Sequence, residues 1–130
     1  MNCWIFVISD SDQEFHSRMA SKKWPMFTKT TNKKTFVAGD HVIFYKAGEN
    51  GQKFIGNATI KEKKDKEDDL GCFIEMFTVS VWKKPVEMRR VLAKMDFIQN
   101  KDSWGNYFRV EAVGISEKDY LEIVSQSQMV

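Results

Sequence analysis

The spacing of hydrophobic residues changes along the chain from that of strands to that of helices and back. The stretch Cys3–Ser9 is apolar on both faces and predicts a central buried strand. After it, Ser11 and Glu14 have the spacing of a helix-capping box. Phe15 and Met19 lie four residues apart, which is one turn of a helix. The first strand is therefore expected to lead into a short amphipathic helix.

The middle of the chain is rich in β-branched and aromatic residues. Strands are predicted at His41–Lys46, Lys53–Ile60 and Cys72–Trp82, with Pro85 closing the last one. The run Lys61–Asp69 consists only of charged residues of both signs, which predicts a mobile surface loop.

The remaining segments complete a mixed pattern. The stretch Lys22–Phe36 contains Pro25 and has no sustained period, so we expect an irregular segment there. Short helical turns are predicted at Glu87–Ile98, a last strand at Trp104–Val110, and a capped amphipathic helix after Ser116. Strands that alternate with short helices indicate an α+β fold with a strongly curved sheet or small barrel.

The length and composition are typical of one globular domain spanning residues 1–130, with 42% hydrophobic and 29% charged residues. No apolar run approaches the ~18–20 residues of a membrane span, so we expect no membrane contact. We also expect the protein to be cytoplasmic and monomeric. Cys3 and Cys72 lie in apolar segments, which predicts buried, reduced thiols.

The net charge of +2 hides an uneven distribution of basic residues. Between Phe15 and Gly39 all the charges are basic, namely Arg18, Lys22, Lys23, Lys29, Lys33 and Lys34. Trp24 and Phe27 lie in the same stretch. Aromatic rings beside cations are typical of a nucleic-acid site, where rings stack on bases and cations hold phosphates. The alternative is a solvated, lysine-rich loop.

Patterns of catalytic and metal sites are missing from the sequence. The two histidines, His16 and His41, form no ligand-spaced pair with the cysteines, and no CxxC or HExxH motif occurs. The glycines do not form the phosphate-binding patterns of dinucleotide or P-loop proteins. We therefore expect no metal, no cofactor and no catalytic residue.

Several short segments also occur in a characteristic order: CWIFVISD, KKWPMFTK, VAGDHVIFYKAG, KFIGNATI, FIQNKDSWGNYFRV and ISEKDYLEI. Together they resemble the EVE domain, a member of the PUA superfamily and a relative of the YTH readers of methylated adenine in RNA. The resemblance implies a twisted, partly closed β-barrel surrounded by short helices. It also implies a concave pocket for one flipped-out, often modified, base.

The resemblance assigns roles to six positions, which are Ser9, Asp10, Trp24, Phe73, Trp104 and Arg109. Ser9 and Asp10 match polar residues that line the pocket, and Trp24 matches the tryptophan that stacks on the base in YTH relatives. Phe73 lies near a second wall of the aromatic cage. Pro25 stands where EVE sequences often have glycine, and it has no N–H group to offer a ligand.

These observations lead to the hypothesis of a non-catalytic module that binds RNA or single-stranded DNA through a modified base. Trp24 is expected to form the exposed wall of an open cleft. The phosphates are expected to lie on Lys22, Lys23, Lys29, Lys33 and Lys34. One alternative is an enzyme or accessory factor for a nucleoside-like metabolite, with Asp10 as general base. Another is a protein-interaction module whose basic loop meets an acidic partner.

Overall fold

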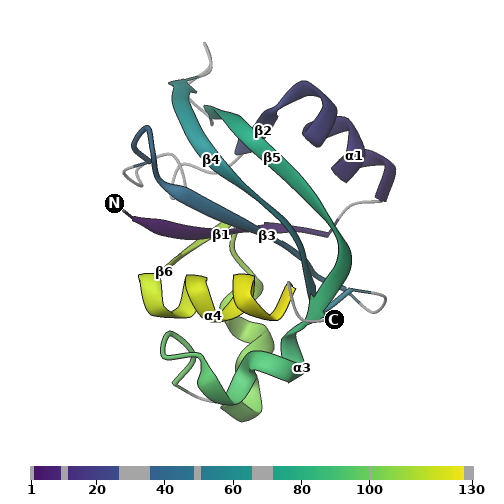
Figure 1. The fold of residues 1–130 in the computed structure, drawn as a ribbon, viewed down its shortest axis with the longest axis vertical. Coiled ribbons are helices and arrows are strands. Elements are labelled where there is room, and N and C mark those ends of the chain that lie inside the picture. The colour runs from purple at the N-terminus through teal and green to yellow at the C-terminus, as the bar shows by residue number, and fades with distance from the viewer. Residues whose placement is uncertain are drawn as a thin grey trace.

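The structure, a computed structural model, describes residues 2–9, 12–26, 36–48, 51–65, 72–99 and 101–127. Within these residues, six strands form one mixed sheet in the order β2-β5-β4-β3-β1-β6. The sheet curls into a half-barrel, with α1 on one side and the other helices on the opposite side (Figure 1). The curved α+β sheet that the sequence predicts is confirmed.

The strands are β1 (Cys3–Ile8), β2 (Lys23–Met26), β3 (His41–Lys46), β4 (Lys53–Asp65), β5 (Cys72–Glu87) and β6 (Ala112–Ile115). The helices are α1 (Asp12–Ser21), α3 (Met88–Val91), the 3₁₀ helices η1 (Leu92–Lys94) and η2 (Lys101–Phe108), and α4 (Glu117–Ser127). Strand β1 runs parallel to β3, and the other neighbours are antiparallel. A parallel pair needs a crossover, and α1 and β2 lie in that connection. Of the helices described, none is long and apolar enough to span a membrane.

The side chains of β1 point alternately into two hydrophobic cores, because both faces of this central strand are buried. Trp4, Phe6 and Ile8 belong to the core under α1, which we call the α1-side core. Cys3 and Ile5 belong to the core under α4, which we call the α4-side core.

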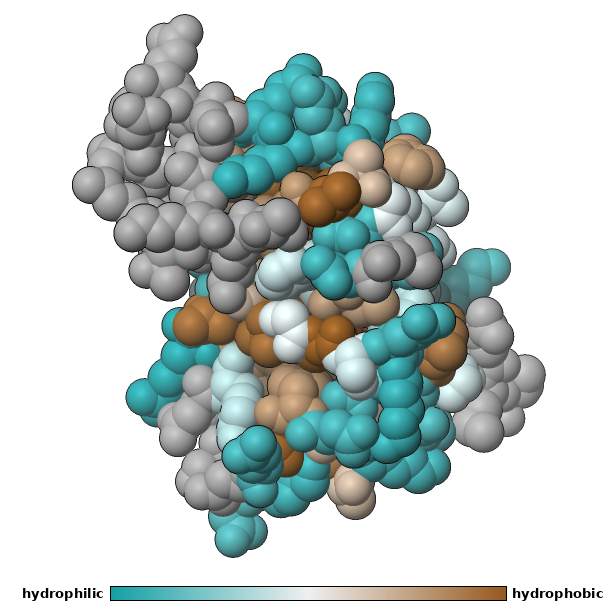
Figure 2. Space-filling model, turned by 90° about the vertical axis from the view of Figure 1, so that its left-hand side faces the viewer, coloured by the Kyte–Doolittle hydropathy of each residue, from teal (hydrophilic) through white to brown (hydrophobic). Residues whose placement is uncertain are grey.

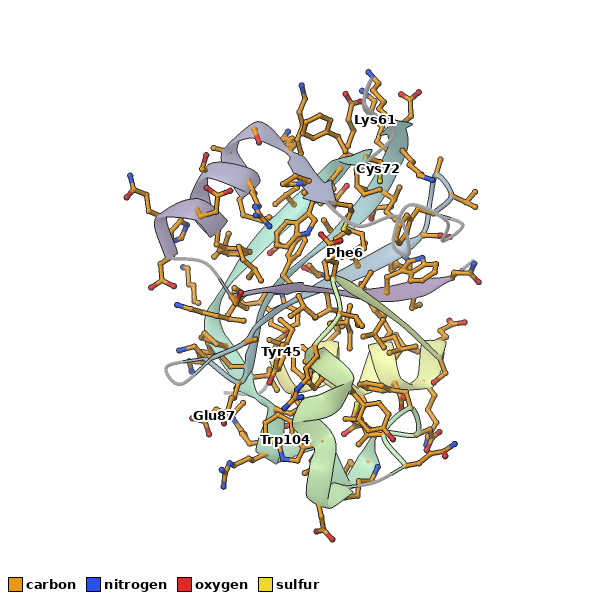
Figure 3. All side chains as sticks on the ribbon, turned by 180° about the vertical axis from the view of Figure 1, so that it is seen from behind. Phe6, Tyr45, Lys61, Cys72, Glu87 and Trp104 are labelled. Atoms are coloured by element: carbon orange, nitrogen blue, oxygen red, sulfur yellow. The ribbon has the colours of Figure 1, made fainter. Side chains whose placement is uncertain are left out.

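The two cores lie on opposite sides of β1 (Figure 3). Phe6 and Cys72 lie in the α1-side core, whereas Tyr45 lies in the α4-side core with Trp104 packed at its margin. Tyr45 stacks on Phe108, with the ring centroids 3.9 Å apart and the planes 16° apart. Aromatic packing of this kind contributes more than area burial alone, and it fixes η2 to the sheet.

Several predicted elements are confirmed. The first strand and the helix after it appear as β1 and α1, and the three middle strands as β3, β4 and β5. The last helix is capped as predicted, because Ser116 Oγ accepts a hydrogen bond from the Asp119 N–H at 3.1 Å. Cys3 and Cys72 are both buried, and neither takes part in a disulfide. Ser11 of the first capping box lies outside the described residues.

The two prolines do not interrupt strands as expected. The predicted irregular segment at Pro25 is wrong in part, because Lys23–Met26 forms β2, which pairs with β5 at the edge of the sheet. Strand β5 also continues through Pro85 to Glu87. An edge strand needs ladder hydrogen bonds on one side only, so proline is tolerated there. Beyond the four residues that β2 covers, this side of β5 has no neighbouring strand among the described residues.

The charged run is not entirely a loop. Lys61–Asp65 extends β4, and Glu62–Asp65 pairs with the first residues of β5. Across the two strands Lys64 Nζ lies 3.0 Å from Glu75 Oε1. The backbone pairing and this cross-strand contact make a strand of residues that composition alone assigns to a loop. Residues 66–69 of the predicted loop lie outside the described residues.

The predicted strand Trp104–Val110 is wrong. Lys101–Phe108 forms η2, and the last strand is β6. Trp104 and Phe108 both lie in this 3₁₀ helix. Their rings meet edge to face at 6.2 Å, and Phe108 is buried in the α4-side core. Tertiary packing of aromatic residues therefore outweighs their preference for strands.

Candidate functional site

A small cavity of about 150 Å³ lies where β1 ends and the edge strand β2 begins. Its lining residues are Val7, Ile8, Ser9, Arg18, Trp24, Pro25 and Glu111. Three of the candidates from the sequence, Ser9, Trp24 and Pro25, are therefore brought together. Pockets for small-molecule ligands usually have about 300–1,000 Å³, so this one suits a single small group.

The end of β1 supplies one wall of the cavity, and backbone hydrogen bonds hold it on both sides. The Val7 N–H donates to the Glu111 carbonyl at 3.0 Å, and the Ala47 N–H donates to the Ile8 carbonyl at 2.8 Å. Ser9 follows the last paired residue and is exposed. Its hydroxyl thus lies at the rim of a rigid strand end.

The turn after α1 brings β2 to the opposite wall. Lys22 has a φ of 58°, the left-handed conformation that often ends a helix. Its N–H donates to the Met19 carbonyl at 3.3 Å, and its own carbonyl accepts from the Met76 N–H at 2.9 Å. These bonds tie the turn to both α1 and β5, and they place Trp24 two residues further along.

The ring of Trp24 is not the exposed wall of an open cleft that the sequence led us to expect. Only 1% of the residue is exposed. The Phe44 ring stacks on it at 4.8 Å with planes 20° apart, and the rings of Phe6 and Phe15 lie at 5.9 and 6.4 Å. The reason is the pairing of β2 with β5, because strand alternation turns Trp24 inward and Pro25 outward.

A buried cation covers part of this indole ring. Arg18 is only 7% exposed, and its Cζ lies 4.6 Å from the centroid of the Trp24 ring. Its Nε donates to Glu14 Oε1 at 3.0 Å, one turn earlier in α1. Desolvated cation–π contacts contribute about 2 kcal/mol or more, so this pair is a stable part of the cavity wall.

Three candidates from the sequence do not line the cavity. Phe73 pairs with Pro25 in the sheet register but is 39% exposed. Trp104 packs beside Phe108 on the α4-side core, in the half of the molecule away from α1 (Figure 3). Arg109 is exposed just after η2. Trp104 therefore packs on the opposite core, and Arg109 lies at the surface.

The predicted phosphate contacts are described only in part. Lys22 and Lys23 are exposed at the start of β2, next to the cavity residues Trp24 and Pro25. The other predicted positions, Asp10, Lys29, Lys33 and Lys34, lie outside the described residues.

Four lining residues are not among the pocket candidates, and two of them, Arg18 and Glu111, are charged. A signal for Arg18 exists in the sequence, because it lies three residues after Phe15 and next to Met19, on the apolar stripe of the helix. Glu111 has no such signal, since only the pairing of β1 with β6 brings it to the cavity.

An exposed ion pair ties the start of α1 to the end of β3. Lys46 Nζ donates to Asp12 Oδ1, and this hydrogen bond lowers the pKa of Asp12. Within the described part of the chain, no three His, Cys, Asp or Glu residues lie close enough together to hold a metal ion.

No family model matches the chain, and no curated protein is significantly similar to it in sequence. Solved structures are nevertheless similar in fold. Protein Atu2648 from Agrobacterium tumefaciens superposes with a TM-score of 0.70 at 15% identity, covering 99% of this chain and 94% of that one.

Two structures solved with nucleic acid share the same arrangement. Human THYN1, in complex with DNA containing 5-methylcytosine, has a TM-score of 0.64 at 10% identity and covers 100% and 99% of the two chains. The fold is that of the EVE and YTH domains. The YTH domain of Zygosaccharomyces rouxii MRB1, in complex with N6-methyladenosine RNA, has a TM-score of 0.61 at 15% identity and covers 98% and 88%. The PUA-like, EVE/YTH type of barrel expected from the sequence is thus confirmed.

Proposed function

We propose that this EVE/YTH-like domain is a non-catalytic module that binds RNA or single-stranded DNA and accepts one flipped-out, modified base. The observation that carries the proposal is the cavity at the end of β1, where Ser9, Trp24 and Pro25 meet. The fold adds support, since THYN1 was solved with 5-methylcytosine DNA and the MRB1 YTH domain with N6-methyladenosine RNA.

The energetics suit a base that is already unpaired. Flipping a base costs a few kcal/mol, and least for a single strand. Hydrogen bonds to Ser9 and Arg18 and phosphate contacts at Lys22 and Lys23 offset this cost. A buried methyl group adds only about 0.8 kcal/mol, so preference for a modified base has to come from the tight shape of the cavity.

Fluorescence anisotropy with short single-stranded oligonucleotides tests the proposal. The oligonucleotides carry 5-methylcytosine, N6-methyladenine or no modification at one central position, and each is titrated across a salt series. We expect salt-dependent binding that is tighter for a modified base. Absence of binding by the folded protein at low salt would refute the proposal.

A matched pair of variants tests whether Lys22 and Lys23 contact the phosphates, as distinct from an effect of the overall charge of the protein. The double variant Lys22→Ala/Lys23→Ala is expected to weaken binding of every oligonucleotide and to reduce the salt slope by about 1.4, which is the value for two phosphate contacts to a single strand. Lys83→Ala/Lys84→Ala removes two exposed lysines from the opposite end of β5 and is expected to leave the slope unchanged.

A further inference from the structure

The face of the sheet that carries α4 continues past this helix toward β2. Ala58 of β4 points into the α1-side core, so Asn57 and Thr59 point to the opposite face. Asn57 Nδ2 donates to the Tyr120 hydroxyl of α4 at 3.4 Å. Thr59 lies two residues further along β4, and its partner across the sheet, Phe77 of β5, is 43% exposed. An exposed aromatic ring therefore lies on this face beyond the part that α4 covers.

Lysine residues surround this part of β5. The charged residues described on the same face, from β2, β4 and β5, are Lys23, Lys61, Glu62, Lys64 and Glu75. Lys64 Nζ lies 3.0 Å from Glu75 Oε1, and this hydrogen bond lowers the pKa of Glu75. The charges of Lys61 and Lys23 lower it further, which places both lysines near Glu75. Because Glu75 precedes Phe77 by two residues, the ring and these charged residues form one surface, which we call the β5 platform.

The β5 platform is continuous with the cavity through Pro25. This residue lines the cavity, and its partner in the sheet register is Phe73, which is 39% exposed. Strand alternation places Phe73 on the same face as Phe77, and the four residues between them correspond to about 13 Å along β5. A single strand whose base enters the cavity can therefore pass Pro25 and follow β5 to Phe77.

We propose, resting on the function proposed above, that the β5 platform binds the nucleotides that flank the flipped base. A flanking base stacks on Phe77, and Lys23 and Lys61, from the strands on either side of β5, contact phosphates. A single exposed hydrophobic residue would need no explanation, but an aromatic ring among cations is the combination that binds single strands. Stacking accepts every base, so the β5 platform adds affinity while the cavity decides which base is preferred.

Removing the Phe77 ring tests the β5 platform. Phe77→Ala is titrated by fluorescence anisotropy with single-stranded oligonucleotides that carry 5-methylcytosine, N6-methyladenine or no modification at one central position. We expect each oligonucleotide to bind about tenfold more weakly than to the wild type, the scale of one base stacked on an aromatic ring. The preference for a modified over an unmodified base should stay unchanged, because Phe77 does not line the cavity.

Further variants control for loss of the ring, of apolar area and of charge. Phe77→Trp keeps a flat ring and should bind at least as tightly as the wild type. Leu121→Ala removes another exposed apolar side chain, on α4, and should leave the affinities unchanged. Lys61→Ala should reduce the salt slope by about 0.7, the value for one phosphate contact to a single strand. Circular dichroism checks folding, and Phe77→Leu, which is apolar but has no ring, replaces Phe77→Ala if that variant does not fold.

The outcomes separate this proposal from the proposed function. If the wild type binds oligonucleotides and Phe77→Ala binds them equally well, the β5 platform is refuted while the proposed function stands. Loss of the preference for a modified base in Phe77→Ala also refutes it, because the ring would then act on the cavity. In gel filtration, a wild-type dimer that becomes a monomer in Phe77→Ala would refute it by assigning this face to a second copy of the chain. If the wild type binds no oligonucleotide, both proposals fail.

Discussion

A cavity lies at each end of β1, and the two cavities differ in volume and in the polar groups that line them. At the N-terminal end, Asn2, Cys3 and Trp4 help to line a cavity of about 530 Å³, together with residues from β6 and the start of α4. It lies toward the side of the molecule shown in Figure 2, where hydrophobic residues form a band between hydrophilic ones. At the C-terminal end lies the smaller cavity of about 150 Å³.

In the larger cavity the acidic groups are bound by the protein itself. The Asp119 carboxylate accepts from the N–H groups of Asp96 and Phe97 at 3.0 to 3.1 Å. Lys118 Nζ donates to Asp96 Oδ2 at 2.9 Å. These bonds fasten the segment after η1 to α4. Asp96 and Asp119 of the larger cavity thus have a structural role.

The smaller cavity differs because its buried cation rests on an aromatic ring at the cavity wall. Arg18 donates from Nε to Glu14, and its Cζ lies 4.6 Å from the centroid of the Trp24 ring. The smaller cavity is proposed as the binding site for this lining and not for its size.

The largest effect is expected from removing the indole of the smaller cavity. Trp24→Ala deletes a ring that is 1% exposed and stacked on Phe44, which should lower the free energy of unfolding by about 3–5 kcal/mol. Urea unfolding measures this loss. Trp24→Phe, which keeps an aromatic ring, is the control and should cost less. A Trp24→Ala protein with wild-type stability would contradict the core role of this ring.

A smaller loss is expected at the larger cavity. Asp119→Ala leaves the N–H groups of Asp96 and Phe97 without their acceptor, which should cost about 2–3 kcal/mol in urea unfolding. Asp119→Asn retains one carbonyl oxygen, so its free energy of unfolding should lie between those of the wild type and Asp119→Ala. Affinity for oligonucleotides should stay unchanged in the folded protein. Weakened binding would instead indicate that the larger cavity belongs to the nucleic-acid site, which would contradict its assignment to a structural role.

The smallest effect concerns alkaline pH and the α4-side core. Burial raises the pKa of Tyr45 and Tyr120. Unfolded tyrosines ionise near about pH 10, so above this pH the unfolded chain loses protons that the folded protein keeps. The free energy of unfolding therefore falls as the pH rises, by at most about 1.4 kcal/mol per pH unit for each group.

The variant Tyr45→Phe isolates one of these contributions. It lacks the hydroxyl that ionises, so its stability should fall less steeply than that of the wild type between about pH 10 and 11.5. Urea unfolding at several pH values gives the two slopes. Identical slopes would mean that the pKa of Tyr45 is the same in the folded and unfolded states.

Local patterns were sufficient for the elements whose neighbours in sequence determine their conformation. The apolar run of β1, the stripe of Phe15 and Met19 in α1, and the cap between Ser116 and Asp119 could all be predicted. The order of the characteristic segments also predicted the EVE/YTH type of barrel. In each case the signal is a period, a cap or a short string that is contained in the sequence itself.

The failures occur where distant segments meet. Pairing with β5 makes a strand of Lys23–Met26 despite Pro25, and that pairing turns Trp24 into the core. Packing against the sheet makes a 3₁₀ helix of Lys101–Phe108. In both places a distant segment of the same chain supplies the hydrogen bonds or the buried area that the local sequence does not specify.

The amino-acid sequence alone thus determined the type of fold, its central strand and three members of the candidate cavity, because these follow from local periodicity and recurring motifs. Only the tertiary structure decided that Trp24 is covered, that Arg18 covers it, and that Glu111 lies on the same cavity. The physical reason is that these relations depend on how strands pair and curl. Strand pairing joins residues far apart along the chain, and no local pattern records it.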